Sequence, residues 1–392
     1  MILGAGIFQL PGIIKARDLG YYVITLDNVP SSIGHQYSHE FVNCSTTDIE
    51  GVLNVAKSKS INGICTFSSD IAIPAVAAVS SELGLPGINR PASKILTQKH
   101  LFREFLSEHS YPNPKYLYSN EYKDLNNISQ SLKCPILFKP VDASGSRGVT
   151  IIESNNSIDE SEAFNIAKNY SKCGIVCVEE FINGREYGGD GFIINGELKL
   201  LAVTNKYLNE FIVTGHRYPS GLGNEKINKI RCLLESICHD IGYCNGPINF
   251  DIMLTLDDIY LLEMSPRNGG NGIPAIIKHV SGVDLEIATI KFSLGEKIDS
   301  TVRSLNPGAG SLVFGSDAEG ILKNIIDCNI LTKDISNIFN VMYTKKIGEQ
   351  VNKFEHNGNL IGYSLFDCES LNDYSSITKA IYNKLDIVVE KY

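Results

Sequence analysis

Apolar residues in the first part of the chain alternate between short β-rich runs and segments with helical spacing. The short runs predict strands at Ile2–Leu3, Tyr22–Asp27, Phe41–Cys44 and Gly63–Phe67. Apolar residues at helical spacing predict the intervening helices Ile13–Leu19, Asp48–Ser60 and Ile71–Leu83. Strands that alternate with helices in this way favour a parallel sheet with helices on both faces. We therefore expect a Rossmann-like α/β unit at the start of the chain.

The middle of the chain combines more β-rich runs with fewer helical segments. Strands are predicted at Pro135–Lys139, Val149–Glu153, Val176–Phe181, Gly191–Ile194, Leu198–Thr204, Ile248–Leu254 and Ile259–Met264. Helices are predicted at Ala92–His109, Ser157–Tyr170 and Glu225–Ile241. Strands that follow one another without helices favour antiparallel pairing, so we expect an α+β body here. Short β-runs after residue 301 and a closing helix at Ser375–Leu385 predict a smaller last part.

Length, composition and charge exclude several classes of protein. With 392 residues, 43% of them hydrophobic and 20% charged, the chain can bury the cores of more than one domain. The formal net charge of -9 gives no general electrostatic reason to bind nucleic acid or an anionic membrane. The longest strongly apolar stretch, Ile71–Val79, is far shorter than the about 20 residues of a bilayer-spanning helix. We therefore expect neither a nucleic-acid nor a membrane partner.

The N-terminus and the cysteines favour a cytoplasmic protein. The chain enters its first predicted strand at once, without the basic and apolar regions of a secretory signal. The closest cysteine pairs, Cys173 with Cys177 and Cys238 with Cys244, do not have the spacing of a zinc or redox motif. We expect a cytoplasmic location and reduced cysteines.

Two glycines and an aspartate in the first region raise the question of a dinucleotide site. Gly4 and Gly6 follow the first predicted strand, and Asp27 closes the second. In a dinucleotide-binding fold such glycines approach the pyrophosphate and the acid binds the ribose. Residues 4–9 read Gly-Ala-Gly-Ile-Phe-Gln and lack the third glycine of that fingerprint. A plain strand-to-helix turn is the preferred interpretation, and an NAD-linked oxidoreductase stays open as an alternative.

A loop rich in small residues follows the predicted strand that carries Lys139. Its residues are Ser144, Gly145, Ser146, Arg147 and Gly148. Backbone N–H groups near the glycines can converge on an anion, the serine and arginine side chains add donors, and Lys139 supplies a fixed positive charge. It is not a Walker loop, because no Gly-Lys-Ser/Thr follows. The segment is either a phosphate-binding loop or a hairpin without a ligand.

The end of another predicted strand has features that suit an adenosine group. The segment comprises Glu179, Glu180, Phe181 and Ile182, and Glu186 follows after an Asn-Gly turn. A chain that leaves a strand can offer backbone groups to an adenine edge, apolar side chains to its faces and a carboxylate to a ribose. A hairpin with solvated acids is the alternative.

Asp251 and Glu263 lie on two predicted strands joined by the polar turn Thr255–Asp258. If these strands form a hairpin, both carboxylates face one side and can hold Mg2+ together with nucleotide phosphates. Arg267 follows in a polar loop, where it can neutralise a carboxylate or an acyl phosphate. The alternative for this loop is a solvated surface segment.

Taken in this order, the motifs resemble the ATP-grasp superfamily. The first region, together with Gly84–Gly87, looks like the pre-ATP-grasp domain of biotin carboxylase and related ligases, which generally does not bind NAD. For the nucleotide, the resemblance implies that Lys99 and Lys139 bind it, that Ser144 to Gly148 form the phosphate loop, that Glu179 to Ile182 form the adenine hinge and that Glu186 lies near the ribose. It also implies that Asp251 and Glu263 are Mg2+ ligands and that Arg267 lies at the reacting acyl group.

Two positions depart from the family pattern. Family members commonly have Asn two residues after the second metal acid, where this chain has Ser265, whose hydroxyl is expected to be a weak metal ligand. The first metal acid is often Glu, and Asp251 is one methylene shorter. Both acids keep the negative charge that the resemblance requires.

The segment Thr214–Ser220 indicates a branch of the superfamily. Its Gly-His-x-x-Pro-Ser pattern ahead of a helix, and the glycine pair after Arg267, are similar to the carboxylate–amine ligases that include L-amino acid ligases. This resemblance implies an amine bound near His216 and Arg217. His216 is either a substrate contact or base, or a plain hydrogen-bonding loop residue.

The resemblance implies an ATP-grasp fold built of α/β and α+β parts. We expect a pre-ATP-grasp domain at residues 1–90, a split ATP-grasp body at residues 91–300 with a lid at about residues 111–180, and a C-terminal cap domain at residues 301–392. By analogy alone, a homodimer is expected.

The expected reaction is an ADP-forming ligation through an acyl phosphate, with ATP and Mg2+ as cofactors and Mn2+ as a substitute. Its partners are a small-molecule carboxylate and an amine, such as amino acids. The main alternative is a bicarbonate-using carboxylase of the biotin carboxylase or aminoimidazole-ribonucleotide type. The NAD-linked oxidoreductase and a non-catalytic nucleotide-binding module are further alternatives.

Overall fold

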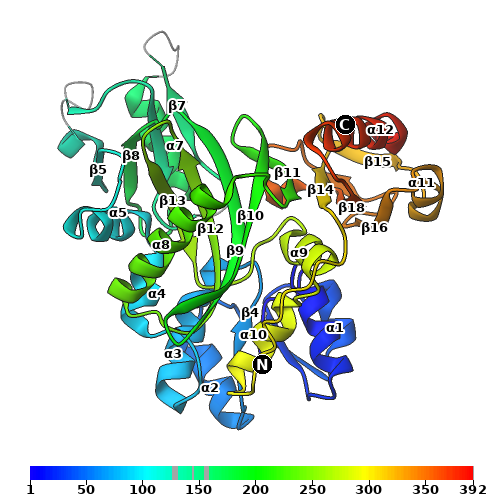
Figure 1. Ribbon diagram of the computed structural model, residues 1–392, viewed down its shortest axis with the longest axis horizontal. Coiled ribbons are helices and arrows are strands. Elements are labelled where there is room, and N and C mark those ends of the chain that lie inside the picture. The colour runs from blue at the N-terminus through cyan, green and yellow to red at the C-terminus, as the bar shows by residue number, and fades with distance from the viewer. Residues whose placement is uncertain (126–130, 144, 154–158, 392) are drawn as a thin grey trace.

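The computed structural model describes residues 1–125, 131–143, 145–153 and 159–391, and these residues form four sheets. In Figure 1 the N-terminal part, blue to cyan, lies at the bottom, and the orange and red C-terminal part lies at the upper right. Long green strands run between them. No helix among the described residues is long and apolar enough to cross a membrane.

A parallel sheet with the order β3-β2-β1-β4 forms the first part. Its strands are β1 (Ile2–Leu3), β2 (Ile24–Asp27), β3 (Glu40–Asn43) and β4 (Cys65–Thr66). The helices around it are α1 (Leu10–Asp18), α2 (Ile49–Ser58) and α3 (Ile73–Leu83), with short 3-10 turns at Ile33–Tyr37 and Asp70–Ala72. Buried Leu3, Leu26 and Val79 share one apolar core. The expected α/β unit is confirmed.

The prediction of a single helix at Ala92–His109 is wrong. Two helices cover this segment, α4 (Arg90–Thr97) and α5 (Lys99–Glu108). Gln98 between them has an extended backbone, with φ −124° and ψ 109°. The break places Lys99 at the start of α5, where its backbone N–H donates to the Val141 carbonyl. Its ammonium group donates to the Ala143 carbonyl at 2.8 Å. The helix break therefore directs Lys99 toward the loop after residue 140.

A small antiparallel sheet has the order β5-β8-β6-β7. Its strands are β5 (Tyr116–Ser119), β6 (Ile136–Pro140), β7 (Thr150–Ile152) and β8 (Val176–Glu180), and a 3-10 turn spans Tyr122–Leu125. Helix α7 (Glu160–Tyr170) packs on it through Phe164, which shares a core with Phe138. Asp159 caps α7, and the start of the helix expected from Ser157 lies outside the described residues.

The largest sheet is antiparallel and has the order β13-β12-β9-β10-β11-β14-β18-β16. We call it the long sheet, and its strands are β9 (Arg185–Ile194), β10 (Glu197–Asn209), β11 (Ile212–Tyr218), β12 (Gly246–Leu254), β13 (Ile259–Ser265), β14 (Ala309–Phe314), β16 (Ile338–Tyr343) and β18 (Gly362–Asp367). Its helices are α8 (Asn224–Ile241), α9 (Ile273–Ser281) and α10 (Leu285–Ser293). The predicted antiparallel body is confirmed, whereas β11, α9 and α10 were not predicted.

The C-terminal strands extend the long sheet. β14 pairs with β11, and Gly215 of β11 allows this close approach, because a Cβ there would lie 2.1 Å from the Ser311 carbonyl oxygen. The remaining elements are β15 (Gly320–Asn324), α11 (Cys328–Asp334), β17 (Gln350–Val351), a 3-10 turn at Asn357–Asn359, α12 (Leu371–Leu385) and β19 (Val388–Glu390). The last part is thus hydrogen-bonded to the strand that carries His216.

Candidate active site

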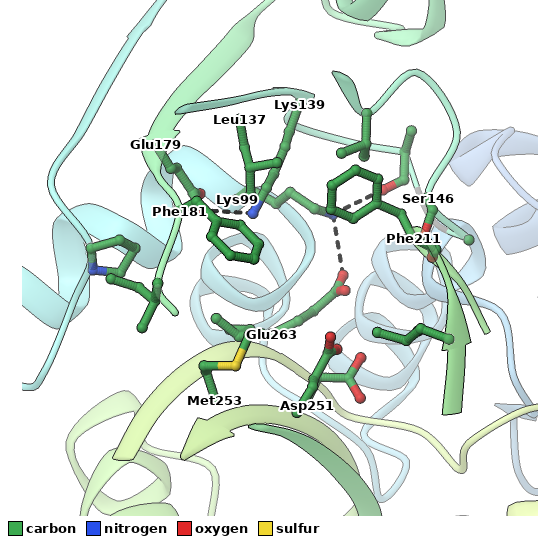
Figure 2. Close-up of a pocket in the computed structure, with 18 of the residues that line it drawn as sticks. Lys99, Leu137, Lys139, Ser146, Glu179, Phe181, Phe211, Asp251, Met253 and Glu263 are labelled. Atoms are coloured by element: carbon green, nitrogen blue, oxygen red, sulfur yellow. Dashed lines mark hydrogen bonds and ion pairs between the residues drawn. The ribbon is translucent and has the colours of Figure 1, made fainter. Parts of the chain in front are cut away.

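A first cavity lies between the small antiparallel sheet and the long sheet (Figure 2). Apolar side chains form much of its wall, among them Leu137, Phe181, Phe211 and Met253. The sequence-predicted residues that line it are Lys99, Lys139, Gly145, Ser146, Arg147, Glu179, Glu180, Phe181, Ile182, Glu186, Asp251 and Glu263. An apolar slot with charged groups at one side suits a flat heterocycle that carries a charged tail.

Asp251 and Glu263 lie opposite each other in the register of the β12–β13 hairpin. Their side chains are 24% and 37% exposed, and Figure 2 shows both at the edge of the cavity. Glu263 Oε1 is 3.2 Å from Lys99 Nζ. Mg2+ in nucleotide sites takes one or two carboxylates together with phosphate oxygens. The two carboxylates fit that ligand pattern.

The expected weak metal binding of Ser265 stays a prediction. This serine is buried at the end of β13, and its hydroxyl hydrogen-bonds to Asp70, where it helps Arg267 to lower the pKa of that carboxyl against the effect of burial. The hydroxyl is therefore engaged with the N-terminal part of the chain.

Lys206 of β10 is a site residue that the sequence reasoning missed. Its ammonium group contacts Asp251 Oδ2 at 2.8 Å and Glu186 Oε1 at 2.5 Å, and only 8% of its side chain is exposed. Burial opposes the positive charge, but the two carboxylates outweigh it and raise the pKa of Lys206. Each candidate metal acid therefore has a lysine partner, Lys206 for Asp251 and Lys99 for Glu263.

Glu179 belongs to a buried ion-pair network, so it is not one of the solvated acids of the alternative hairpin interpretation. Arg103 of α5 contacts Glu179 Oε1 at 3.0 Å, and Lys139 contacts Oε2 at 2.8 Å. Burial alone would raise the pKa of the Glu179 carboxyl, but Arg103 and Lys139 outweigh it and hold that pKa well below its usual range. Arg103 also donates to the carbonyls of Leu261 and Leu262. The carboxylate of Glu179 thus fixes Lys139, and Arg103 joins α5 to both sheets.

The remaining hinge residues offer fewer backbone donors than expected. The Glu180 N–H donates to the Lys115 carbonyl at 3.0 Å, and the Phe181 N–H donates to the Pro135 carbonyl at 2.8 Å. The Glu180 carboxylate accepts a hydrogen bond from the Lys133 backbone. These two N–H groups are therefore occupied, and the segment contributes its apolar side chains to the cavity wall.

The phosphate-loop candidate closes over the first cavity. Ser144 lies outside the described residues. Gly145 and Gly148 have φ of +69° and +70°, and a Cβ on Gly148 would lie 2.7 Å from the Tyr170 ring. The Ser146 hydroxyl donates to the Phe211 carbonyl at 2.7 Å, which ties the loop to the long sheet. Gly148 thus shapes the loop, while Gly145, Ser146 and Arg147 line the cavity.

A second cavity of about 770 Å3 adjoins the first. Residues 6–9 and 29–36 from the N-terminal part and residues 343–349 and 357–360 from the C-terminal part contribute to its walls. The side chains and loop residues that line both cavities are Gly145, Arg147, Lys206, Val213, Asp251 and Glu263. The two cavities therefore meet at the candidate metal acids.

Arg267 lies in the wall of the second cavity and is held by four hydrogen bonds. Its Nε and Nη2 donate to the two oxygens of Asp70 at 2.8 and 2.7 Å. Its Nη1 donates to Asn249 Oδ1 at 2.7 Å and to the Asn268 carbonyl at 3.1 Å. A guanidinium group has five donors, so one remains for a substrate. Asp70 thereby couples the N-terminal part to the proposed acyl-site arginine.

Asn249 is itself oriented by Asp190 on the neighbouring strand β9. Asp190 Oδ1 accepts from Asn249 Nδ2 and from the Gly269 N–H, each at 2.9 Å. Burial raises the pKa of Asp190 to about 7. Neither Asp190 nor Asp70 was predicted, because their roles depend on contacts between distant segments.

His216 and Arg217 point to opposite faces of β11. His216 lines the second cavity, is 2% exposed, and its Nδ1 lies 3.0 Å from Thr204 Oγ1. Burial and the nearby Lys206 lower the pKa of His216 to about 3, so its ring is neutral. Arg217 donates to the carbonyls of Pro219 and Glu369 on the other face. The structure therefore brings His216, but not Arg217, to the cavity.

The low pKa of His216 gives a test by protein stability. Between the ordinary histidine pKa of about 6.5 and the folded value, the unfolded chain binds a proton that the folded protein excludes. We expect the free energy of unfolding to fall less steeply from pH 6 to pH 4 for His216→Gln than for the wild type, as measured by urea denaturation. His239→Gln is the matched control, because 83% of that side chain is exposed, and its pH profile should follow the wild type. Equal slopes for His216→Gln and wild type would contradict the prediction.

The turn that contains Gly4 and Gly6 donates backbone hydrogen bonds to the side chains of Asp27 and Gln9. Asp27 Oδ2 accepts from the Ala5 N–H and Oδ1 accepts from the Val29 N–H, each at 2.9 Å. The Gly6 N–H donates to Gln9 Oε1 at 3.0 Å. The carboxylate expected to bind a ribose in a dinucleotide site thus stabilises the turn, which agrees with the preferred interpretation.

Comparison with known proteins gives consistent results. The ATP-grasp domain model matches residues 132–275. The formate-dependent phosphoribosylglycinamide formyltransferase of Trichormus variabilis is 23% identical over 340 residues, which are 81% of each chain. The L-amino acid ligase of Bacillus licheniformis has a TM-score of 0.83 at 19% identity, covering 100% of this chain and 98% of that chain. The biotin carboxylase domain of Hydrogenobacter thermophilus 2-oxoglutarate carboxylase, in complex with MgADP, ADP and bicarbonate, has a TM-score of 0.77 at 15% identity, covering 99% and 90%.

The matched residues 132–275 include strands of both antiparallel sheets that border the first cavity. Residues 132–275 thus match an ATP-grasp domain, and the chain as a whole has the fold of the L-amino acid ligase and of the biotin carboxylase domain.

Proposed function

We propose that the chain is an ADP-forming carboxylate–amine ligase that acts through an acyl phosphate. The observation that carries this proposal is the junction of two cavities at Asp251, Glu263 and Lys206. The first cavity has the apolar slot and charged edge that suit ATP. The second, of about 770 Å3, is within the range of about 300–1,000 Å3 that holds small organic ligands. It has room for an organic carboxylate beside an amine.

The proposed reaction has two steps. A substrate carboxylate oxygen attacks the γ-phosphorus of ATP, the bond to the β,γ-bridging oxygen breaks, and ADP leaves with that electron pair. The amine nitrogen then attacks the acyl carbon, the carbon–oxygen bond to phosphate breaks, and the departing phosphate takes up the proton that the amine loses. The product is an amide.

The residues of this chain bind the reactants and exclude water in that scheme. Lys99 and Lys139 bind phosphate oxygens, and the loop at residues 145–148 covers them. Asp251 and Glu263 would hold Mg2+, which when bound supplies positive charge for phosphate oxygens. The free donor of Arg267 stabilises the acyl group. Replacement of Mg2+ by Mn2+ stays a prediction.

The three-part organisation into residues 1–90, 91–300 and 301–392 is part of the proposal. The parallel N-terminal sheet supports the first boundary. The pairing of β14 with β11 means that the third part shares a sheet with the second. A homodimer stays an expectation by analogy.

The bicarbonate-using carboxylase is the second candidate, and one assay separates it from the ligase. Purified protein with ATP and Mg2+ should release ADP and phosphate only when both a carboxylate and an amine are present. With an 18O-labelled carboxylate, one labelled oxygen should appear in the released phosphate, because the acyl phosphate loses that oxygen when the amine attacks. Release that needs bicarbonate and no other carboxylate would favour the carboxylase instead.

A further inference from the structure

A buried acid that the proposed reaction does not use lies behind the wall of the second cavity. Asp190 on β9 is 0% exposed. Its hydrogen-bond donors among the described residues are the Asn249 side chain and the Gly269 backbone, and none of the ion pairs in that part of the chain includes it. A carboxylate that is buried without an ion pair is costly, so its presence needs an explanation.

Two acceptors fix the side-chain amide of Asn249. Its Nδ2 donates to Asp190 Oδ1 and to the Gly189 carbonyl, each at 2.9 Å. Because both partners are acceptors, the amide nitrogen faces them and the amide oxygen faces away. That oxygen accepts from Arg267 Nη1 at 2.7 Å. A rotated amide would place an NH2 group against the guanidinium group, and neither of them could accept. Asp190 thereby acts on Arg267 through Asn249.

The hydrogen bonds of Arg267 identify its free donor. Nε and Nη2 each give one hydrogen to Asp70. Nη1 gives its two hydrogens to the Asn249 side chain and to the Asn268 carbonyl. A guanidinium group carries five N–H hydrogens, so the second hydrogen of Nη2 is the one that remains. Arg267 lines the second cavity, and the direction of this N–H there depends on how Nη1 is held on the other side of the group.

The same carboxylate holds the loop that follows Arg267. The Gly269 nitrogen lies 2.9 Å from both oxygens of Asp190. A Cβ on Gly269 would lie 2.8 Å from Asp190 Oδ1 and from Asn249 Nδ2, so only glycine fits at this position. One buried acid therefore fixes both the amide that holds the guanidinium group and the backbone beside it. This double contact accounts for an acid without an ion pair.

Building on the proposed ligase function, we propose that Asp190 is a positioning residue, which acts through Asn249 to aim the free N–H of Arg267 Nη2 at the acyl group. When the amine attacks the acyl carbon, negative charge develops on the acyl oxygen, and a donor that is fixed in advance stabilises it. Asp190 itself touches no substrate and transfers no proton.

The first arm of the test observes Arg267 directly and needs no substrate. In Asp190→Leu, the Arg267 Nη1 hydrogens should exchange with water at least about 10-fold faster than in the wild type, because Asn249 loses one of its two anchors. NMR of the isotope-labelled guanidinium group at low temperature measures this rate, and Arg267→Lys assigns the signal. Asp190→Asn keeps one acceptor oxygen and should restore most of the protection. Asp257→Leu changes an exposed acid in the β12–β13 turn and should match the wild type.

The second arm measures turnover. Asp190→Leu should lower kcat for carboxylate-dependent ADP release at least about 10-fold, with a KM for ATP within about twofold of the wild type. Because Asp190 acts through Arg267, adding Asp190→Leu to Arg267→Lys should lower kcat little further than Arg267→Lys alone. Losses that multiply would overturn the proposal, since they would mean that Asp190 has an independent, structural role.

The NMR arm separates this inference from the proposed function. Unchanged exchange at Arg267 in a folded Asp190→Leu protein would overturn the positioning role. Should Asp190→Leu not fold, Asn249→Ala removes the same link at the cavity wall, and wild-type exchange at Arg267 in that variant would overturn the proposal equally. If the wild type shows no carboxylate-dependent turnover but Asp190→Leu still speeds the exchange, the ligase proposal fails and the positioning of Arg267 stands.

Discussion

Replacing Glu263 by Gln is expected to lower kcat for carboxylate-dependent ADP release by about 100-fold to 1,000-fold. The reason is that Glu263 lies opposite Asp251 in the hairpin register and 3.2 Å from Lys99, so one charge serves both the proposed Mg2+ site and a proposed nucleotide-binding lysine. The measurement is steady-state ADP release over a range of Mg2+ concentrations. A higher Mg2+ requirement should accompany the loss of rate.

The Glu263→Gln experiment has a matched control on the same sheet. Glu197→Gln changes an acid with a side chain that is 68% exposed on β10, and it should leave the rate unchanged. The thermal unfolding temperature of Glu263→Gln should stay near the wild-type value, because its side chain is 37% exposed. Wild-type turnover in a folded Glu263→Gln protein would remove this residue from the proposed site.

Replacing Arg103 by Met is expected to lower the free energy of unfolding by about 3 kcal/mol. Arg103 and Glu179 each have 2% of their side chains exposed, so the substitution leaves a buried carboxylate with Lys139 as its charged partner. Urea denaturation at pH 7 measures the loss. Lys57→Met breaks the exposed pair with Glu82 and should cost less than about 1 kcal/mol. Equal losses in the two variants would contradict a buried network.

The same pair predicts an acid response with a definite sign. The pKa of Glu179 is lowered in the folded protein, so its contribution to stability is complete above the unfolded pKa of about 4.3 and is lost as the pH falls toward the folded value. Arg103→Met removes one cause of that low pKa. Its free energy of unfolding should therefore fall less steeply than that of the wild type below pH 4.

The local pattern of apolar and polar residues was sufficient to predict those strands and turns that depend on residues close together in the sequence. Alternating apolar positions on either side of a polar turn predicted the β12–β13 hairpin and the shared face of Asp251 and Glu263. The strand that carries Lys139 and the position of the glycine loop after it followed in the same way. Whether these residues bind ATP and Mg2+ stays a prediction.

Contacts between distant segments could not be predicted from one sequence. Arg103 lies inside the segment predicted as helix at Ala92–His109, yet it bonds to Glu179, 76 residues away. Asp70 bonds to Arg267 across 197 residues. Lys206 lies two residues beyond the strand predicted at Leu198–Thr204. The pairing of β9 with both β10 and β12 places it beside Glu186 and Asp251. The split of the expected helix at Gln98 likewise had no clear local signal, since neither Gly nor Pro marks it.

In the C-terminal part, the strands that extend the long sheet differ in role from the segment that lines the second cavity. Backbone pairing fixes β16 and β18 in the same sheet that carries Lys206 and His216. The segment between these strands, residues 344–361, contributes Lys345, Glu349 and Asn357 to the wall of the second cavity. Within that connecting segment Val351, Leu360 and Ile361 are buried, whereas Lys345, Glu349 and Asn357 are not. Substitutions at the cavity-wall positions that are not buried can therefore change what the second cavity admits, while the buried positions keep the sheet of the proposed site in register.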